Sequence, residues 1–248
     1  MILLADDSWE IKTTKHKGRG IFATKDIPAG TVIGDYLGKV IKTAEEDTYE
    51  TDEGLYLMYY HDYASLHPTD VNEPGIHLIN HACLPNCWMY TYKGHTLFFA
   101  LRHIFKGEEL TISYLLSPDA ACDPCKHTCK CESILCYQSM HLSQELFDQW
   151  DTLNEAQAKT TKRERVRYGH ELPKLTTYPD TIPDHPFYSL VGAIEQPPLT
   201  RADKKLPTLH ELRRIIRKTG RTIAFPRLKT RVLGVQNGVI ISEPLEPA

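Results

Sequence analysis

Three closely spaced cysteines suit a metal site. They form a C-x-C-x4-C pattern, which consists of Cys129, Cys131 and Cys136. Thiolates are preferred zinc ligands, and a structural zinc site is tetrahedral with four of them, so this pattern is one ligand short. A competing set, drawn from slightly further upstream, consists of Cys122, Cys125, His127 and Cys129.

A second candidate binding feature is the block Lys17-Gly18-Arg19-Gly20. Glycine lets the backbone approach a ligand closely and adopt positive φ. The two basic side chains would suit a ligand that carries a carboxylate. Because G-x-G also occurs in ordinary turns, the block gains meaning only from the motifs around it.

Two longer motifs follow. Residues 80–87 read N-H-A-C-L-P-N-C, and residues 107–114 read G-E-E-L-T-I-S-Y. They resemble the N-H-x-C-x-P-N and G-E-E-L-T-x-x-Y motifs of the SET-domain protein lysine methyltransferases. The G-x-G block before them and the C-x-C-x4-C pattern after them stand in that family's order. The resemblance covers about residues 15–140 and does not extend to the rest of the chain.

The resemblance implies a fold. It predicts a mainly β structure with short helices, the β-clip SET fold with a pseudo-knot, followed by a mixed α/β C-terminal extension. The predicted domains are a SET domain over 1–116, a post-SET zinc-binding segment over 117–142, and an extension over 143–248 that is basic over 159–231.

The resemblance also implies S-adenosylmethionine as the methyl donor. Main-chain groups of the G-x-G block and of the Asn-His pair would contact this cofactor, and a methionine after the cysteine pattern would pack on its adenine. The matching positions are Lys17, Gly18, Arg19, Gly20, Asn80, His81 and Met140.

For the metal, the family supplies the fourth ligand from the cysteine of N-H-x-C, which matches Cys83. The favoured zinc ligands are therefore Cys83, Cys129, Cys131 and Cys136. This set would tie the post-SET segment to the active site, where it would close one wall of a lysine channel. Cys87 is interpreted as a buried thiol without a metal.

Tyr114, the last residue of G-E-E-L-T-I-S-Y, is the predicted catalytic residue. Methyl transfer to lysine needs a neutral amine, although the pKa of a free lysine is about 10.4. Desolvation and a neighbouring positive sulfonium both lower that pKa, so the remaining task is orientation. A tyrosine hydroxyl can accept weak C–H hydrogen bonds from the methyl group and align the amine. Tyr36 resembles the tyrosine that lines the family's lysine channel.

Two departures from the family pattern are visible. The family often carries Arg-Phe where this chain has His77 and Leu78, and often Phe or Tyr where it has Ile112. The smaller Ile112 leaves room for water or added methyl groups. Two other interpretations compete with the enzyme: a catalytically silent SET module that binds partners, and a zinc-dependent nucleic-acid-binding protein that uses 159–231.

The elements that would position these residues are read from periodicity and turn signals. Strands are predicted over 31–41, 55–63, 97–101 and 110–114, with a turn or short helix over 43–53. Helical spacing follows over 143–159 and 208–218, and strands flank Asn237-Gly238 within 223–241. Seven prolines over 171–207 predict an extended wrap over the surface.

Charge is divided unevenly along the chain. Residues 1–158 hold 12 Lys and Arg against 23 Asp and Glu, whereas 159–231 hold 17 against 7. The acidic part suits a basic protein substrate, such as a histone, that presents a lysine. The basic part suits DNA or a nucleosome, unless the two regions pair within the chain. With no apolar run long enough to span a bilayer, we expect no membrane contact and an intracellular protein: nuclear or chromosomal in a eukaryote, otherwise cytoplasmic.

Overall fold

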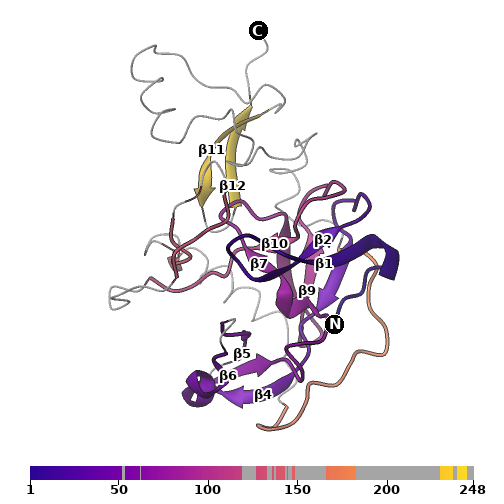
Figure 1. Ribbon diagram of the computed structural model, residues 1–248, viewed down its shortest axis with the longest axis vertical. Coiled ribbons are helices and arrows are strands. Elements are labelled where there is room, and N and C mark those ends of the chain that lie inside the picture. The colour runs from indigo at the N-terminus through magenta and orange to yellow at the C-terminus, as the bar shows by residue number, and fades with distance from the viewer. Residues whose placement is uncertain are drawn as a thin grey trace.

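The computed structural model describes residues 1–51, 54–61, 63–118, 127–132, 136, 138–142, 144, 147–148, 166–182, 230–236 and 239–244. In these residues the regular secondary structure consists mainly of short strands (Figure 1), with 3-10 helices η1 (Asp6–Ser8), η2 (Thr43–Tyr49) and η3 (Ile76–Leu78). The predicted mainly β fold with short helices is confirmed. Within these residues, no helix is long and apolar enough to cross a membrane.

The central sheet holds much of the core. It contains β3 (Val32–Asp35), β9 (His95–Ala100) and β8 (Cys87–Tyr92), antiparallel in the order β3-β9-β8. Every residue of β9 is buried, because the strand lies between two others and packs on both faces. Beside this sheet, β1 (Trp9–Thr13) and β2 (Arg19–Ala23) pair as an antiparallel ribbon.

A second three-stranded sheet lies at the lower end of Figure 1. It contains β4 (Lys39–Lys42), β6 (Ala64–His67) and β5 (Met58–His61), in the order β4-β6-β5. Helix η2 packs beside β4 and β6, which confirms the turn or short helix predicted over 43–53. The strand predicted over 55–63 is shorter than expected and begins at Met58.

The continuous strand predicted over 31–41 is wrong, because the chain leaves one sheet and enters another. Strand β3 ends at Asp35, Tyr36 to Gly38 are irregular, and β4 begins at Lys39. Gly38 approaches the carbonyl of His67 so closely that a side chain on this glycine would collide with it. This glycine within the predicted strand thus marks a close approach between two backbone segments. This break places Tyr36 at the junction of the two sheets.

Residues 166–182, which we call the strap, pack against both sheets (orange in Figure 1). Isolated bridges join Glu171 to Lys39 and Thr181 to Thr31, and Leu172 and Ile182 are buried. The extended wrap predicted over 171–207 is confirmed for the described part of it. The strap packs into the core although, in the sequence, it follows the last of the motifs by about 30 residues.

Little of the remaining C-terminal extension lies in the described residues. Strands β11 (Thr230–Gln236) and β12 (Val239–Pro244) pair antiparallel on either side of 237–238, which confirms the predicted hairpin. Gln144, Phe147 and Asp148 are helical, in agreement with the helix predicted over 143–159. The rest of that helix and the helix over 208–218 lie outside the described residues.

Candidate functional site

The N-H-x-C-x-P-N and G-E-E-L-T motifs meet at a short parallel pair of strands, β7 (Asn80–His81) and β10 (Thr111–Ile112). Asn80 is 8% exposed. Its side-chain amide donates to the carbonyl of Arg19 (2.9 Å) and to Oε1 of Glu109 (2.8 Å). One buried side chain thus joins three motifs that are distant in sequence. These are contacts that a pseudo-knot would require between its segments.

The basic side chains of the G-x-G block make contacts within the protein. The ammonium of Lys17 forms an ion pair with Glu109, and both side chains are largely shielded from solvent. The guanidinium of Arg19 donates to the carbonyls of Val71 (2.8 Å) and Asn72 (3.0 Å). Lys17 and Arg19 therefore fix the block to its neighbours in this structure, and their main-chain groups remain the candidates for ligand contact.

Tyr114 lies two residues beyond the end of β10, next to β7. Its backbone amide donates to Nδ1 of His81 (3.1 Å) and its hydroxyl donates to the carbonyl of Ile79 (3.2 Å). The residue is 39% exposed, so it is accessible to a substrate. Desolvation raises the pKa of the Tyr114 phenol above its usual value, so the hydroxyl keeps its proton at neutral pH. Burial lowers the pKa of His81 to about 4, which leaves this ring neutral.

Tyr36 is 3% exposed, with its ring 6.3 Å from that of Phe98. Burial raises its pKa, and electrostatic interactions with Tyr114 and Tyr56 raise it further. These interactions place three phenols in one neighbourhood. Tyr56 is a residue that the sequence analysis missed. Its ring contacts His77 edge-on at 5.5 Å, and the only sequence signal was its place in a tyrosine-rich segment.

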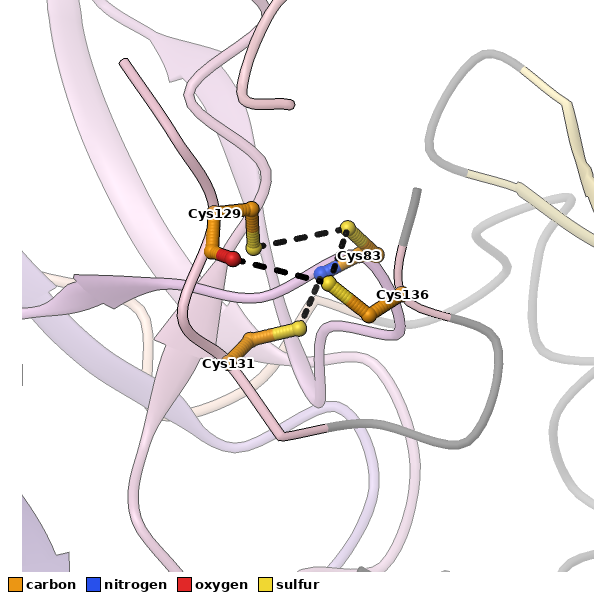
Figure 2. Close-up of side chains that lie close together, drawn as sticks. All are labelled: Cys83, Cys129, Cys131 and Cys136. Carbon is orange, nitrogen blue, oxygen red and sulfur yellow. Dashed lines mark hydrogen bonds between the residues drawn. The ribbon is translucent and has the colours of Figure 1, made fainter. Parts of the chain in front are cut away.

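The four cysteines of the favoured set lie together (Figure 2). Their sulfur atoms all lie within 4.8 Å of one another. Sγ of Cys83 is 3.6 Å from Sγ of Cys129 and 4.0 Å from Sγ of Cys136. Zn–S bonds of about 2.3 Å in a tetrahedron place sulfurs about 3.8 Å apart, so the spacing fits zinc. The four-cysteine cluster can therefore bind zinc.

Backbone amides support this cluster, as expected for ligands that become thiolates. The amide of Cys83 donates to Sγ of Cys131 (3.5 Å), and the amide of Gln138 donates to Sγ of Cys136 (3.3 Å). The neighbouring thiol of Cys129 lowers the pKa of Cys131, because a thiolate at Cys131 can accept its hydrogen bond. Met140 packs against the cluster.

The competing ligand set is only partly described. Cys122 and Cys125 lie outside the described residues, whereas Cys129 belongs to the four-cysteine cluster. His127 places Nδ1 3.0 Å from Nε2 of His141. Cys87, interpreted as a buried thiol, is fully buried, and its Sγ donates to the side-chain oxygen of Asn86 (3.3 Å).

A cavity of about 320 Å³ lies between the G-x-G region and the cysteine segment. His16, which precedes the block, lines one side of it. The residues that line it from the cysteine segment are Thr128, Cys129, Lys130, Glu132, Cys136 and Gln138. The open volume therefore lies beside the four-cysteine cluster, and on the other side it is lined by His16, two residues before Gly18.

Comparison with known proteins matches residues 18–115 to the SET domain. This segment is a SET domain. Similar proteins include the histone-lysine N-methyltransferase trithorax of Drosophila virilis, 35% identical over 106 residues, which are 39% of this chain and 3% of that protein. Human histone-lysine N-methyltransferase 2B is 32% identical over 128 residues, 48% of this chain and 5% of that protein.

An H3 lysine-9 specific histone-lysine N-methyltransferase of Schizosaccharomyces pombe is 35% identical over 126 residues, 44% of this chain and 26% of that protein. The chain therefore spans only a small part of the relatives it matches. The SET match includes Tyr36, Asn80 and Tyr114. It ends before the three clustered cysteines of the 129–136 segment and before the strap, although both segments contact matched residues.

Proposed function

We propose that this chain is a protein-lysine N-methyltransferase that uses S-adenosylmethionine and acts on a lysine in a basic protein segment, with histones as the substrate class. The observation that carries the proposal is the accessible Tyr114, which lies beside β7 with Tyr36 and Tyr56 nearby. The histone-lysine N-methyltransferase names of the relatives support the substrate class. We accordingly propose a nuclear location.

The residues fit the methyl donor. The cavity is lined by His16, just before the G-x-G block, and by the cysteine segment, and Gly20 lies against Glu109 and Asn80 with no space for a side chain. We assign Lys17, Gly18, Arg19, Gly20, Asn80, His81 and Met140 to cofactor contact. When bound, S-adenosylmethionine supplies an electrophilic methyl group on a sulfonium.

The tyrosines would act on the substrate amine. Desolvation raises the pKa of the phenols of both Tyr36 and Tyr114, so neither phenol carries a negative charge at neutral pH. A lysine held between them forms no ion pair with these groups that would hold it as the ammonium, and desolvation then lowers its pKa. The Tyr114 hydroxyl can orient the neutral amine toward the methyl carbon, which is the geometry that transfer requires.

The decisive experiment is incubation of the purified chain with labelled S-adenosylmethionine and a panel of histones, followed by mass spectrometry of modified lysines. We expect label on a histone lysine, and a rise of Tm with the cofactor alone. A raised Tm without transfer to any substrate would favour the silent SET module. If the chain shows neither methyl transfer nor a rise of Tm with the cofactor, the proposed function is refuted.

Gly20→Ala tests the cofactor assignment. An added Cβ would lie 2.6 Å from Oε1 of Glu109 and 2.9 Å from Nδ2 of Asn80, so both side chains must move. We expect S-adenosylmethionine affinity to fall by about tenfold or more, since a core clash of this kind costs about 1–3 kcal/mol. Isothermal titration measures this change.

The control is Gly107→Ala. Gly107 has φ +90° and open space around its Cβ position, so alanine there introduces backbone strain without displacing Asn80. It should lower Tm while cofactor affinity stays unchanged. Equal affinity in wild type and Gly20→Ala would contradict the assignment.

We further propose that the basic region 159–231, with 17 Lys and Arg against 7 Asp and Glu, contacts DNA or the nucleosome. A deletion that tests this should keep the strap, because Leu172 and Ile182 are buried in the core. Truncation after residue 182 removes 11 of these 17 Lys and Arg, and it is expected to leave peptide methylation intact and to weaken DNA and nucleosome binding strongly at about 50 mM salt. If the full-length protein binds neither DNA nor the nucleosome, the proposed contact is refuted. Pairing of the basic region with the acidic region 1–158 within the chain would then remain as the alternative.

A further inference from the structure

The strap binds on both sides of Tyr36. On the β4 side, the amide of Val40 donates to the carbonyl of His170 (2.9 Å), and the amide of Leu172 donates to the carbonyl of Gly38 (2.9 Å). On the β3 side, the amide of Val32 donates to the carbonyl of Asp180 (2.9 Å). The irregular segment that carries Tyr36 is thus held by a part of the chain outside the matched SET residues.

Asp35, the residue before Tyr36, has a fully buried side chain. Its Oδ2 accepts a hydrogen bond from the hydroxyl of Tyr178 in the strap (2.9 Å) and lies 2.7 Å from Nδ1 of His95 in β9. Among the described residues, Oδ1 has no hydrogen-bond partner. A buried carboxylate is costly unless it is paired, so both contacts to Oδ2 matter for its position.

The Tyr178 hydroxyl is itself oriented. The amide of Leu175 donates to it (3.1 Å), which leaves its own proton for Asp35. Desolvation raises the pKa of Tyr178 to about 12, so it stays a donor at neutral pH. The strap therefore donates an oriented hydrogen bond to the buried side chain of Asp35, the residue next to Tyr36.

We propose that Tyr178 and His95 are positioning residues for methyl transfer: through Asp35 they fix the backbone at Tyr36, so this one hydrogen bond from the strap, and not the packing of the strap as a whole, contributes to catalysis. This inference rests on the proposed function. Tyr178 touches no reacting group, and its effect passes through Asp35. Loss of its hydroxyl leaves the buried carboxylate with one hydrogen bond fewer, and the adjacent Tyr36 can then shift relative to Tyr114.

The test compares Tyr178→Phe with Ile182→Ala in the full chain. Tyr178→Phe keeps the ring and removes only the hydroxyl, whereas Ile182→Ala weakens the strap at its far end, where the amide of Ile182 bonds Gly30 (2.8 Å). We expect Tyr178→Phe to lower kcat by about 10- to 100-fold with KM for S-adenosylmethionine unchanged. Ile182→Ala should lower Tm with kcat unchanged below the transition.

Amide hydrogen exchange supplies a measurement that does not depend on activity. In wild type the Tyr36 amide donates to the carbonyl of Thr96 (3.1 Å). Exchange over residues 34–37 should be about tenfold faster in Tyr178→Phe and unchanged in Ile182→Ala. His95→Gln alters the other contact of Asp35 and should also speed exchange over residues 34–37. This variant replaces Tyr178→Phe in the test if Tyr178→Phe does not fold.

The outcomes are separable. Unchanged exchange over 34–37 in Tyr178→Phe would overturn the positioning role, whether or not the wild type transfers methyl groups. A kcat that falls in Ile182→Ala as much as in Tyr178→Phe would reduce the strap to a structural element. If the wild type is inactive but exchange rises as expected, the hydrogen-bond path to Tyr36 stands and only the proposed function fails.

Discussion

Tyr114→Phe is expected to lose about 10²-fold or more of methyl transfer, the loss associated with misplacement of the reacting groups, while cofactor binding is retained. The substitution removes only the hydroxyl, which donates to the carbonyl of Ile79. The Tyr114 amide that bonds His81 is unaffected. Without the hydroxyl, the methyl group loses a hydrogen-bond acceptor and the amine loses its alignment.

The cost to the fold should be small. One neutral hydrogen bond contributes about 0.5–1.5 kcal/mol, so Tm should fall by only a few degrees. Single-turnover rates and the S-adenosylmethionine-induced rise of Tm separate chemistry from binding. The matched control is Tyr59→Phe, because Tyr59 is 53% exposed on β5. A Tyr114→Phe rate close to that of wild type would remove Tyr114 from the proposed mechanism.

The candidate site was largely predictable because its residues lie in short linear motifs. Each motif is local in sequence, and the order of the motifs along the chain suggested which segments meet. The four-cysteine cluster shows the value of this order: spacing supplied three ligands, and the family resemblance supplied Cys83, now found 3.6 Å from Cys129. The roles assigned to these residues remain predictions until the variants are measured.

The sequence did not predict where the strand over 31–41 breaks. Its composition is typical of one strand, but the break depends on a distant partner, because the His67 carbonyl lies against Gly38. Local propensity cannot show such a contact. As a result, the position of Tyr36 between two sheets was also unpredictable.

The strap was predicted only as an extended segment. Its prolines exclude helix, but an extended chain has no period that identifies its partners. The hydrogen bond from Tyr178 to Asp35 joins residues 143 positions apart. Tyr56 was missed for a related reason, since its neighbours Tyr36 and Tyr114 come from other parts of the chain.

Cys131→Ser is expected to remove zinc and activity together. Wild type should contain about one zinc ion per chain, held by four thiolates in a closed structural site. Cys131 is the most accessible of the four, so serine there introduces little packing strain. Three thiolates remain, and the metal loses its tetrahedral coordination.

Loss of metal should also release the cysteine segment. Few described backbone bonds hold this segment: the amide of Cys129 donates to Gln138 (3.1 Å), that of Met140 to His127 (2.9 Å), and that of Leu142 to Leu116 (3.0 Å). A structural zinc contributes directly to folding free energy. Because the cavity is lined by this segment, cofactor affinity should fall with the metal.

Metal content by mass spectrometry, and the absorption of a cobalt-substituted sample, report the site without an activity assay. Cys87→Ser is the control, since Cys87 is buried but outside the cluster, and it should keep its zinc. Zinc retained in Cys131→Ser but lost in Cys122→Ser would assign the metal to the competing set of Cys122, Cys125, His127 and Cys129.

Cys83→Ser tests whether the metal joins the cysteine segment to β7. If Cys83 is a ligand, its loss frees the cysteine segment from β7, and S-adenosylmethionine should no longer raise Tm although the Tyr114 side is intact.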